Sequence, residues 1–250
     1  MTKAAPSDQG SPPGGTTLNV LLESKTAPEP QATKTRPRAT RSVVRFIAVS
    51  AAFLLLGNLA ILGASLVAQG STTKAMIREI PGIDHLEAVD GKLWRGGAPS
   101  SEGYRGLAAA GVTTIVDLRA EEGIEPDLDY ARSLGLEVVS IPIRDGQTPS
   151  AEQVQAFLRA TERSSGNVFV HCGAGVGRTG TMVGAWLVST GELNGRGAVR
   201  RNLAVGPPSL EQVVFVANMQ RGEIGRPNVA VRAVSRVLDA PRRIWHRIGL

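Results

Sequence analysis

The chain has 250 residues, of which 42% are hydrophobic and 20% are charged, and this composition excludes a wholly disordered chain and a multi-span membrane protein. Its single cysteine excludes an intramolecular disulfide and a cysteine-rich zinc module. The net charge of +6 comes from the two ends, because residues 1–45 and 227–250 each carry a surplus of four basic side chains whereas residues 46–226 are slightly acidic. The central region therefore offers no basic surface for a polyanion, and we predict no nucleic-acid partner.

The first part of the chain changes abruptly from polar to apolar. Residues 1–45 are rich in proline, threonine, serine and basic residues, which predicts a disordered basic tail. Residues 46–68 contain no charge, and these 23 residues are enough for one helix to cross a bilayer. A cleaved signal peptide or a buried soluble helix are the alternatives. Since the apolar region of a signal peptide is normally shorter, we favour an uncleaved single-span anchor.

The charges around this span bear on its orientation. Five basic residues lie just before the span, and only Lys74 and Arg78 follow it closely. The positive-inside rule then predicts a cytoplasmic N-terminus with the C-terminal domain on the opposite side. A reduced thiol would be safer in the cytosol, so the topology stays open.

After a linker over residues 69–84, a domain over residues 85–226 alternates strand and helix patterns. Strands are predicted at 92–95, 112–118, 136–142 and 167–170, and helices at 104–110, 127–134, 151–162 and 179–188. A serine with a glutamine three residues later predicts a capping box at Ser150 and another at Ser209. The alternation predicts an α/β fold, with a central, mostly parallel sheet flanked by helices on both faces.

A glycine-rich segment, His-Cys-Gly-Ala-Gly-Val-Gly-Arg-Thr-Gly, joins the last predicted strand to a helical run. Such a turn before a helix N-terminus can bind an anion through its N–H groups and the helix dipole. The guanidinium of Arg178 can bind two oxygens of one phosphoryl group, and the same positive field favours a thiolate at Cys172. A nucleophile, an anion site and a bidentate cation therefore converge within seven residues.

This His-Cys-x5-Arg-Thr segment resembles the signature loop of the cysteine-dependent protein tyrosine and dual-specificity phosphatases. Residues 93–119 are similar to the opening of the compact, bacterial-type members, and residues 141–158 to their general-acid loop and the helix after it. The resemblance covers about residues 85–225. It implies a dual-specificity-phosphatase-like fold and a metal-independent phosphomonoester hydrolase.

The resemblance also implies roles for individual residues. Cys172 would be the nucleophile that forms a cysteinyl-phosphate, and Arg178 would bind the equatorial phosphate oxygens. The hydroxyl of Thr179 would ease departure of the thiolate, and His171 would orient the loop rather than transfer protons. The remaining phosphate contacts would come from the backbone of Gly173, Ala174, Gly175, Val176, Gly177 and Arg178.

A general acid must protonate the leaving oxygen, and two aspartates are candidates. Asp145 lies in a loop after a predicted strand, which matches the position of the family's acid, so we favour it. Asp117 ends an earlier strand in Asp-Leu-Arg and suits a structural pair with Arg119. Arg144 could contact a substrate anion or be solvated. Gln212 could position the hydrolytic water, although a capping role is favoured.

Other conspicuous residues have structural interpretations. The three histidines form no cluster with carboxylates or the cysteine, so we predict no metal site and no cofactor. His85, Trp94 and Trp186 are interpreted as structural or core residues. Residues 227–250 form a basic amphipathic segment, which could lie on anionic lipid or be an ordinary solvated helix.

The absence of charged residues in the middle of the signature loop bears on the substrate class. The five residues between Cys172 and Arg178 carry no charge, whereas phosphoinositide-selective relatives tend to have lysines there. We therefore favour a phosphoprotein substrate, with a membrane lipid or inositol phosphate as the alternative. A non-catalytic phosphate-binding scaffold and a rhodanese-like sulfur transferase are weaker alternatives. The sequence does not indicate an oligomeric state.

Overall fold

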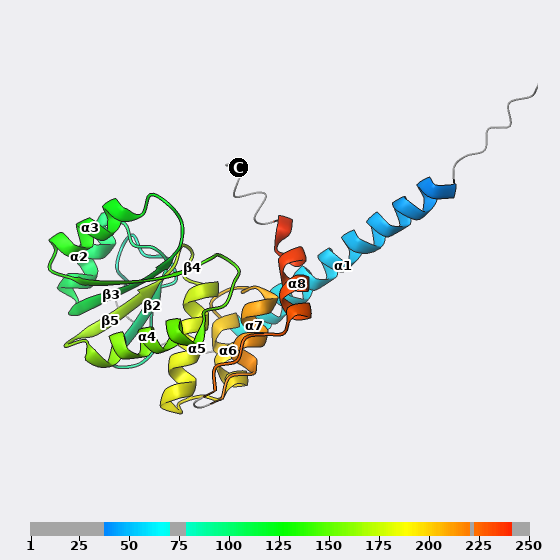
Figure 1. Cartoon of the computed structure of the whole chain (residues 1–250). Coiled ribbons are helices and arrows are strands. Elements are labelled where there is room, and N and C mark those ends of the chain that lie inside the picture. The colour runs from blue at the N-terminus through cyan, green and yellow to red at the C-terminus, as the bar shows by residue number, and fades with distance from the viewer. Residues whose placement is uncertain (1–37, 71–78, 221–222, 242–250) are drawn as a thin grey trace, which may run out of the picture. The chain divides into compact units, whose positions relative to one another are not determined.

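The structure is a computed structural model, and it describes residues 38–70, 79–220 and 223–241 (Figure 1). Its first helix is α1 (Arg38–Gln69). Within it, Ser42–Gln69 has a mean hydropathy of 2.2 and is long and apolar enough to cross a membrane. The helix starts eight residues before the predicted span, because residues 38–45 contain no proline that would interrupt it. Residues 1–37 of the predicted tail, and Lys74 and Arg78, lie outside the described residues.

A five-stranded sheet lies at the centre of the domain (Figure 1). Its strands are β1 (Glu87–Ala88), β2 (Leu93–Gly96), β3 (Val112–Arg119), β4 (Glu137–Ile143) and β5 (Asn167–His171). Their order is β1-β2-β5-β3-β4, and all neighbours are parallel except β1 and β2. The predicted mostly parallel sheet is therefore confirmed, with one short antiparallel strand at its edge.

Helices cover both faces of this sheet, as predicted (Figure 1). They are α2 (Ser101–Ala109), α3 (Glu125–Ser133), α4 (Ala151–Arg163), α5 (Gly177–Thr190), α6 (Gly195–Leu203), α7 (Leu210–Ala217) and α8 (Val229–Leu238). Successive residues of β3 face opposite sides, so that Ile115 packs with α2 and α3 and Val116 packs with α4 and α5. This alternation follows from the two-residue period of a strand and buries both faces of the sheet.

The predicted elements agree with the structure within a few residues. Both capping boxes are formed, with Ser150 at the start of α4 and Ser209 at the start of α7. Two elements were not predicted, β1 and α6, because β1 has two residues and α6 is short, polar and contains two glycines. Part of the predicted C-terminal segment forms α8, and residues 242–250 lie outside the described residues.

Candidate active site

The glycine-rich loop connects the end of β5 to the start of α5, at the carboxyl edge of the parallel strands. Cys172 directly follows β5, and it is 3% exposed. Gly175 has φ +73°, and a Cβ there would lie 2.4 Å from the carbonyl carbon of Gly96 in β2. Only glycine fits this position, because the loop backbone is in a left-handed conformation and also touches the neighbouring strand.

The carbonyl groups of this loop are bonded by groups that lie outside it. Ala98 N donates to Gly173 O (2.8 Å), His85 Nδ1 bonds Ala174 O (2.9 Å), Arg95 Nη2 donates to Gly175 O (2.6 Å), Gly180 N donates to Val176 O (3.0 Å), and Thr181 Oγ1 donates to Gly177 O (2.9 Å). In a trans peptide the C=O and the following N–H point in opposite directions. The N–H groups of residues 174–178 therefore face away from these partners.

These five N–H groups donate to no protein acceptor among the described residues. Backbone donors that converge at the first turn of a helix form a ready anion site. Since their orientation is already fixed by the carbonyl contacts, an anion would bind without reorganising the loop. This arrangement is compatible with the phosphate site that the glycine spacing predicts, and that site stays a prediction.

Arg178 lies in the first turn of α5 and is 4% exposed. Its Nη1 donates to Glu121 Oε2 (2.9 Å) and to Ile143 O (3.1 Å). Its Nε lies 3.5 Å from Asp145 Oδ1. Burial opposes the charged form, but the bond to Glu121 and the charges of Cys172 and Asp145 outweigh it and raise the pKa of Arg178. The guanidinium is therefore a permanent cation beside the loop.

Glu121 is a site residue that the sequence analysis missed. It follows β3 by two residues, and its carboxylate bonds Arg178 through both oxygens, at 2.9 and 2.8 Å. Partial burial opposes its ionisation, but the bond from Arg178 prevails and lowers the pKa of Glu121. Its position at the carboxyl end of a parallel strand was the available signal, because such ends gather at one edge of the sheet.

The structure separates the two candidate acids. Asp117 is fully buried, and its Oδ2 accepts from Arg119 Nη2 at 2.8 Å. Asp145 is 46% exposed in its side chain and lies in the loop between β4 and α4, beside Arg178. A fully buried carboxylate that is bound by an arginine cannot reach a leaving group, so Asp145 remains the proposed acid. The adjacent Arg144 is exposed.

The loop that carries Asp145 is attached to the N-terminus of α7. Ser209 Oγ donates to Gly146 O (2.8 Å), and Gln212 Nε2 donates to Gln147 O (3.1 Å). The carboxylate of Glu211, which is 3% exposed, accepts from N and Oγ1 of Thr148 (3.3 and 3.0 Å). Gln212 also closes the predicted capping box through its Oε1, and that oxygen lies 2.5 Å from the position of a Cβ on Gly177.

His171 ends β5 and is fully buried. Burial lowers the pKa of His171 to about 4, so the ring is neutral near pH 7. Its Nδ1 bonds Cys172 O (3.3 Å), and its ring stacks on Phe169 with centroids 5.6 Å apart. This environment suits the predicted orienting role, because a ring with no solvent access cannot exchange protons readily with a substrate.

Thr179 is also fully buried, and its Oγ1 has no hydrogen-bond partner among the described residues. It sits one residue after Arg178, on the first turn of α5, where the resemblance assigns it to the sulfur. His85, which was interpreted as structural, is exposed beside the loop and has φ +53°.

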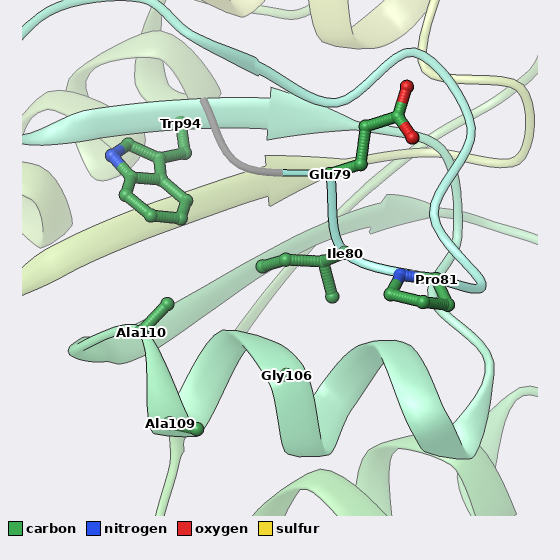
Figure 2. A pocket seen from close by; sticks show the side chains of 7 residues that line it. All are labelled: Glu79, Ile80, Pro81, Trp94, Gly106, Ala109 and Ala110. Carbon is green, nitrogen blue, oxygen red and sulfur yellow. The ribbon is translucent and has the colours of Figure 1, made fainter. Parts of the chain in front are cut away.

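A separate cavity of about 420 Å³ lies between the N-terminal segment of the domain, β2 and α2 (Figure 2). Its walls are Glu79, Ile80, Pro81, Trp94, Gly106, Ala109 and Ala110. No residue of the glycine-rich loop lines it, and Trp94 is half-buried on its wall. Trp186 is instead fixed by a hydrogen bond from Nε1 to Asp90 Oδ2. Among the described residues, no group of three His, Cys, Asp or Glu side chains could hold a metal ion.

A buried cysteine, a buried arginine and a glycine-rich anion loop between a strand and a helix define a cysteine-dependent phosphatase-like domain. The family model described as "DSP-PTPase phosphatase fused to NAD+ Kinase" matches residues 81–220. The chain therefore belongs to this family, and the suspected relationship to dual-specificity-like phosphatases is confirmed.

Curated proteins match shorter parts of the chain. "Probable NAD kinase 2, chloroplastic" from Oryza sativa subsp. japonica is 43% identical over 110 residues, which are 41% of this chain and 11% of that protein. "Tyrosine-protein phosphatase cdc-14" from Caenorhabditis elegans is 38% identical over 77 residues, which are 31% of this chain and 10% of that protein. The chain thus matches about a tenth of the length of each of these relatives.

Solved structures are similar over most of the domain. Tk-PTP in the active form is 24% identical with a TM-score of 0.43, and the match covers 65% of this chain and 99% of that chain. The core catalytic domain of the PP-IP phosphatase SIW14 from S. cerevisiae is 15% identical with a TM-score of 0.48, and the match covers 67% and 97% of the two chains.

Proposed function

We propose that the chain is a phosphomonoester hydrolase that works through a cysteinyl-phosphate intermediate. The observation that carries this proposal is that the carbonyls of residues 173–175 are bonded by Ala98, His85 and Arg95, and those of Val176 and Gly177 by the next turn of α5. Among the described residues, the N–H groups of residues 174–178 are left without a protein acceptor, in the segment that joins Cys172 to Arg178. Such fixed donors stabilise the charge that develops on a transferring phosphoryl group.

The reaction would proceed in two displacements. The thiolate of Cys172 attacks phosphorus, the bond to the leaving oxygen breaks, and Asp145 gives that oxygen its proton. Water then attacks the cysteinyl-phosphate while Asp145 accepts a proton from it, and the P–S bond breaks to return the thiolate. Arg178 and the loop N–H groups hold the equatorial oxygens in both steps. The hydroxyl of Thr179 donates to the departing sulfur.

Turnover of p-nitrophenyl phosphate by the full-length chain in detergent micelles tests this mechanism. We expect Cys172→Ser to abolish measurable turnover, because a neutral hydroxyl is a far weaker nucleophile than a thiolate. Undiminished turnover by Cys172→Ser would end the proposal. Tight binding of a phosphopeptide by the unaltered chain without any turnover would instead favour a non-catalytic scaffold.

As the substrate we favour a phosphorylated protein, on tyrosine or on serine and threonine. Two features support this choice: the uncharged residues between Cys172 and Arg178, and curated relatives with the names "Tyrosine-protein phosphatase cdc-14" and "Dual specificity protein phosphatase CDC14AB". A membrane lipid or inositol phosphate is the second candidate, because the apolar α1 would hold the site near headgroups. Comparing kcat/KM for phosphopeptides, phosphatidylglycerophosphate and inositol phosphates discriminates between them.

We further propose that α1 anchors the protein in a membrane as a single span, with its N-terminus in the cytoplasm. The support is its length and hydropathy and the basic residues that precede it. Resistance of the membrane-bound protein to extraction at alkaline pH tests the anchor. Protease accessibility of the domain in intact cells tests the orientation, and it also shows which compartment supplies the phosphates.

A further inference from the structure

Arg95 is the largest fully buried side chain among the described residues. It lies in β2, where its backbone is paired with Val170 of β5, two residues before Cys172. Like Leu93, it points to the α5 side of the sheet, because alternate strand residues share a face. An arginine is almost never buried without a specific partner, so its position requires an explanation.

Its hydrogen bonds go to the glycine-rich loop and to α6. Nη2 donates to Gly175 O at 2.6 Å, to Asn202 Oδ1 at 3.3 Å and to Val176 O at 3.5 Å. Nε and Nη1 have no hydrogen-bond partner among the described residues. The shortest of these contacts therefore holds the carbonyl of the one loop glycine that has a positive φ.

Among the described residues, Arg95 also forms no ion pair with a carboxylate. Burial lowers the pKa of Arg95 to about 10, which still leaves the guanidinium charged near neutral pH. Two acidic groups favour its charged form, Glu87 and Cys172. Glu87 is already paired with Arg201, whose Nη2 lies 3.0 Å from its Oε1. Cys172 also interacts with the charge of Arg178, so two buried cations act on its sulfur, Arg178 in α5 and Arg95 in β2.

We propose that Arg95 is a positioning residue of this site, which turns the Gly175 carbonyl away from the phosphate and places a fixed positive charge behind the loop that favours the ionised sulfur of Cys172. The effect of Arg95 on turnover rests on the proposed function. The effect of Arg95 on the sulfur of Cys172 can be measured without a substrate. This positioning role differs from the role of Arg178, since Arg95 is separated from the anion site by the loop backbone.

Alkylation with iodoacetamide reports on the sulfur directly, because Cys172 is the only cysteine of the chain. The experiment compares alkylation rates at pH 6 and pH 9 for the full-length chain in detergent micelles. Arg95→Met removes the positive charge at similar side-chain volume. We expect it to lower the ratio of the alkylation rate at pH 6 to the rate at pH 9 by about tenfold, because a nearby opposite charge typically shifts the pKa of an ionisable group by about one unit or more. Arg105→Met is the matched control, since Arg105 is exposed on α2 and, among the described residues, its side chain bonds the hydroxyl of Tyr130 alone.

Arg95→Lys separates the charge from the hydrogen bonds. A lysine keeps the positive charge but not the guanidinium that reaches Gly175 O, so we expect the alkylation ratio within about twofold of the unaltered chain and kcat lowered by about tenfold at a similar KM. Circular dichroism checks that each variant is folded. If Arg95→Met does not fold, the kcat of Arg95→Lys tests the role of Arg95. Unchanged kcat together with an unchanged alkylation ratio, in every folded Arg95 variant, would overturn the role of Arg95. If the unaltered chain shows no turnover, the proposed function fails while the alkylation comparison still decides this role.

Discussion

The two loops that form the site are held in different ways. In the glycine-rich loop, the carbonyls of residues 173–175 are bonded by side chains and backbone of other segments, and those of residues 176 and 177 by the next turn of α5. Its arginine, Arg178, is buried. The loop with Asp145 is attached at residues 146–148 to α7, while Asp145 itself is half exposed and 3.5 Å from Arg178. The difference is what the proposed function requires, namely a phosphate site that is organised in advance and an acid that is free to move when substrate binds or product leaves.

The largest expected effect comes from changing Arg178, the arginine at the end of the glycine-rich loop. Arg178→Lys should lower kcat/KM by about 10³ for every substrate, because an ammonium cannot bind two phosphate oxygens in one plane and cannot keep the bonds to Glu121 and Ile143. Steady-state kinetics with aryl and alkyl phosphates check this. We expect the same loss of kcat/KM for good and poor leaving groups. A loss limited to poor leaving groups would contradict the role of Arg178 in binding the phosphoryl oxygens.

The acid should show the opposite dependence on the leaving group. We expect Asp145→Asn to lower kcat by about 10² for alkyl phosphates and much less for p-nitrophenyl phosphate, whose leaving oxygen needs no proton. Asp129→Asn is the control, because Asp129 is an exposed carboxylate on α3 that pairs only with Arg132. A uniform loss for both kinds of substrate would contradict the role of Asp145.

The buried His171, at the end of β5, should also make the stability of the fold depend on pH. The pKa of His171 is about 4 in the folded state and 6.5 as a free side chain, so between these values the unfolded chain binds a proton that the folded chain does not. The free energy of unfolding should therefore fall by about 3 kcal/mol as the pH drops from 7 to 4. Urea unfolding at several pH values in this range should show that the free energy of unfolding depends less steeply on pH in His171→Gln than in the unaltered chain. An equal dependence on pH would mean that another group titrates.

A comparison of two glycines tests how tightly the phosphate loop is packed. Gly123 and Gly175 both have positive φ, but a Cβ on Gly123 would meet nothing within 4 Å whereas one on Gly175 would meet the backbone of Gly96. Gly123→Ala should cost about 1 kcal/mol of stability and leave kcat unchanged. Gly175→Ala should destabilise more and lower kcat by about tenfold, because a 1 Å shift of catalytic groups is enough for such losses. Similar effects of both substitutions would contradict the close packing against β2.

The smallest effect is expected for the attachment of the acid loop. Ser209→Ala and Ser150→Ala each remove a capping serine, at a cost of about 1 kcal/mol. Only Ser209 also donates to Gly146 O beside Asp145. We therefore expect Ser209→Ala alone to lower kcat, by about threefold and only for alkyl phosphates, since these need the acid. Thermal unfolding and kinetics measured together check both parts.

Much of the fold was predictable because its signals are local. Strand and helix patterns, both capping boxes and the uninterrupted apolar run of α1 depend on residues that are close in the chain. The same holds for Cys172 and Arg178, which one loop brings together. β1 and α6 escaped prediction because they are too short or too polar to show a periodic pattern.

The rest of the site depends on partners that are distant in sequence. Glu121 is 57 residues from Arg178, Arg95 is 80 residues from Gly175, and Ser209 is 63 residues from Gly146. No periodicity encodes such pairs, since each forms only when parallel strands bring their carboxyl ends to one edge of the sheet and α7 packs beside it. The chain's local chemistry thus predicts the nucleophile and the anion loop. The packing of the folded chain determines which groups orient that loop, hold its arginine and attach its acid, because hydrogen bonds between remote segments exist only once the core has been buried.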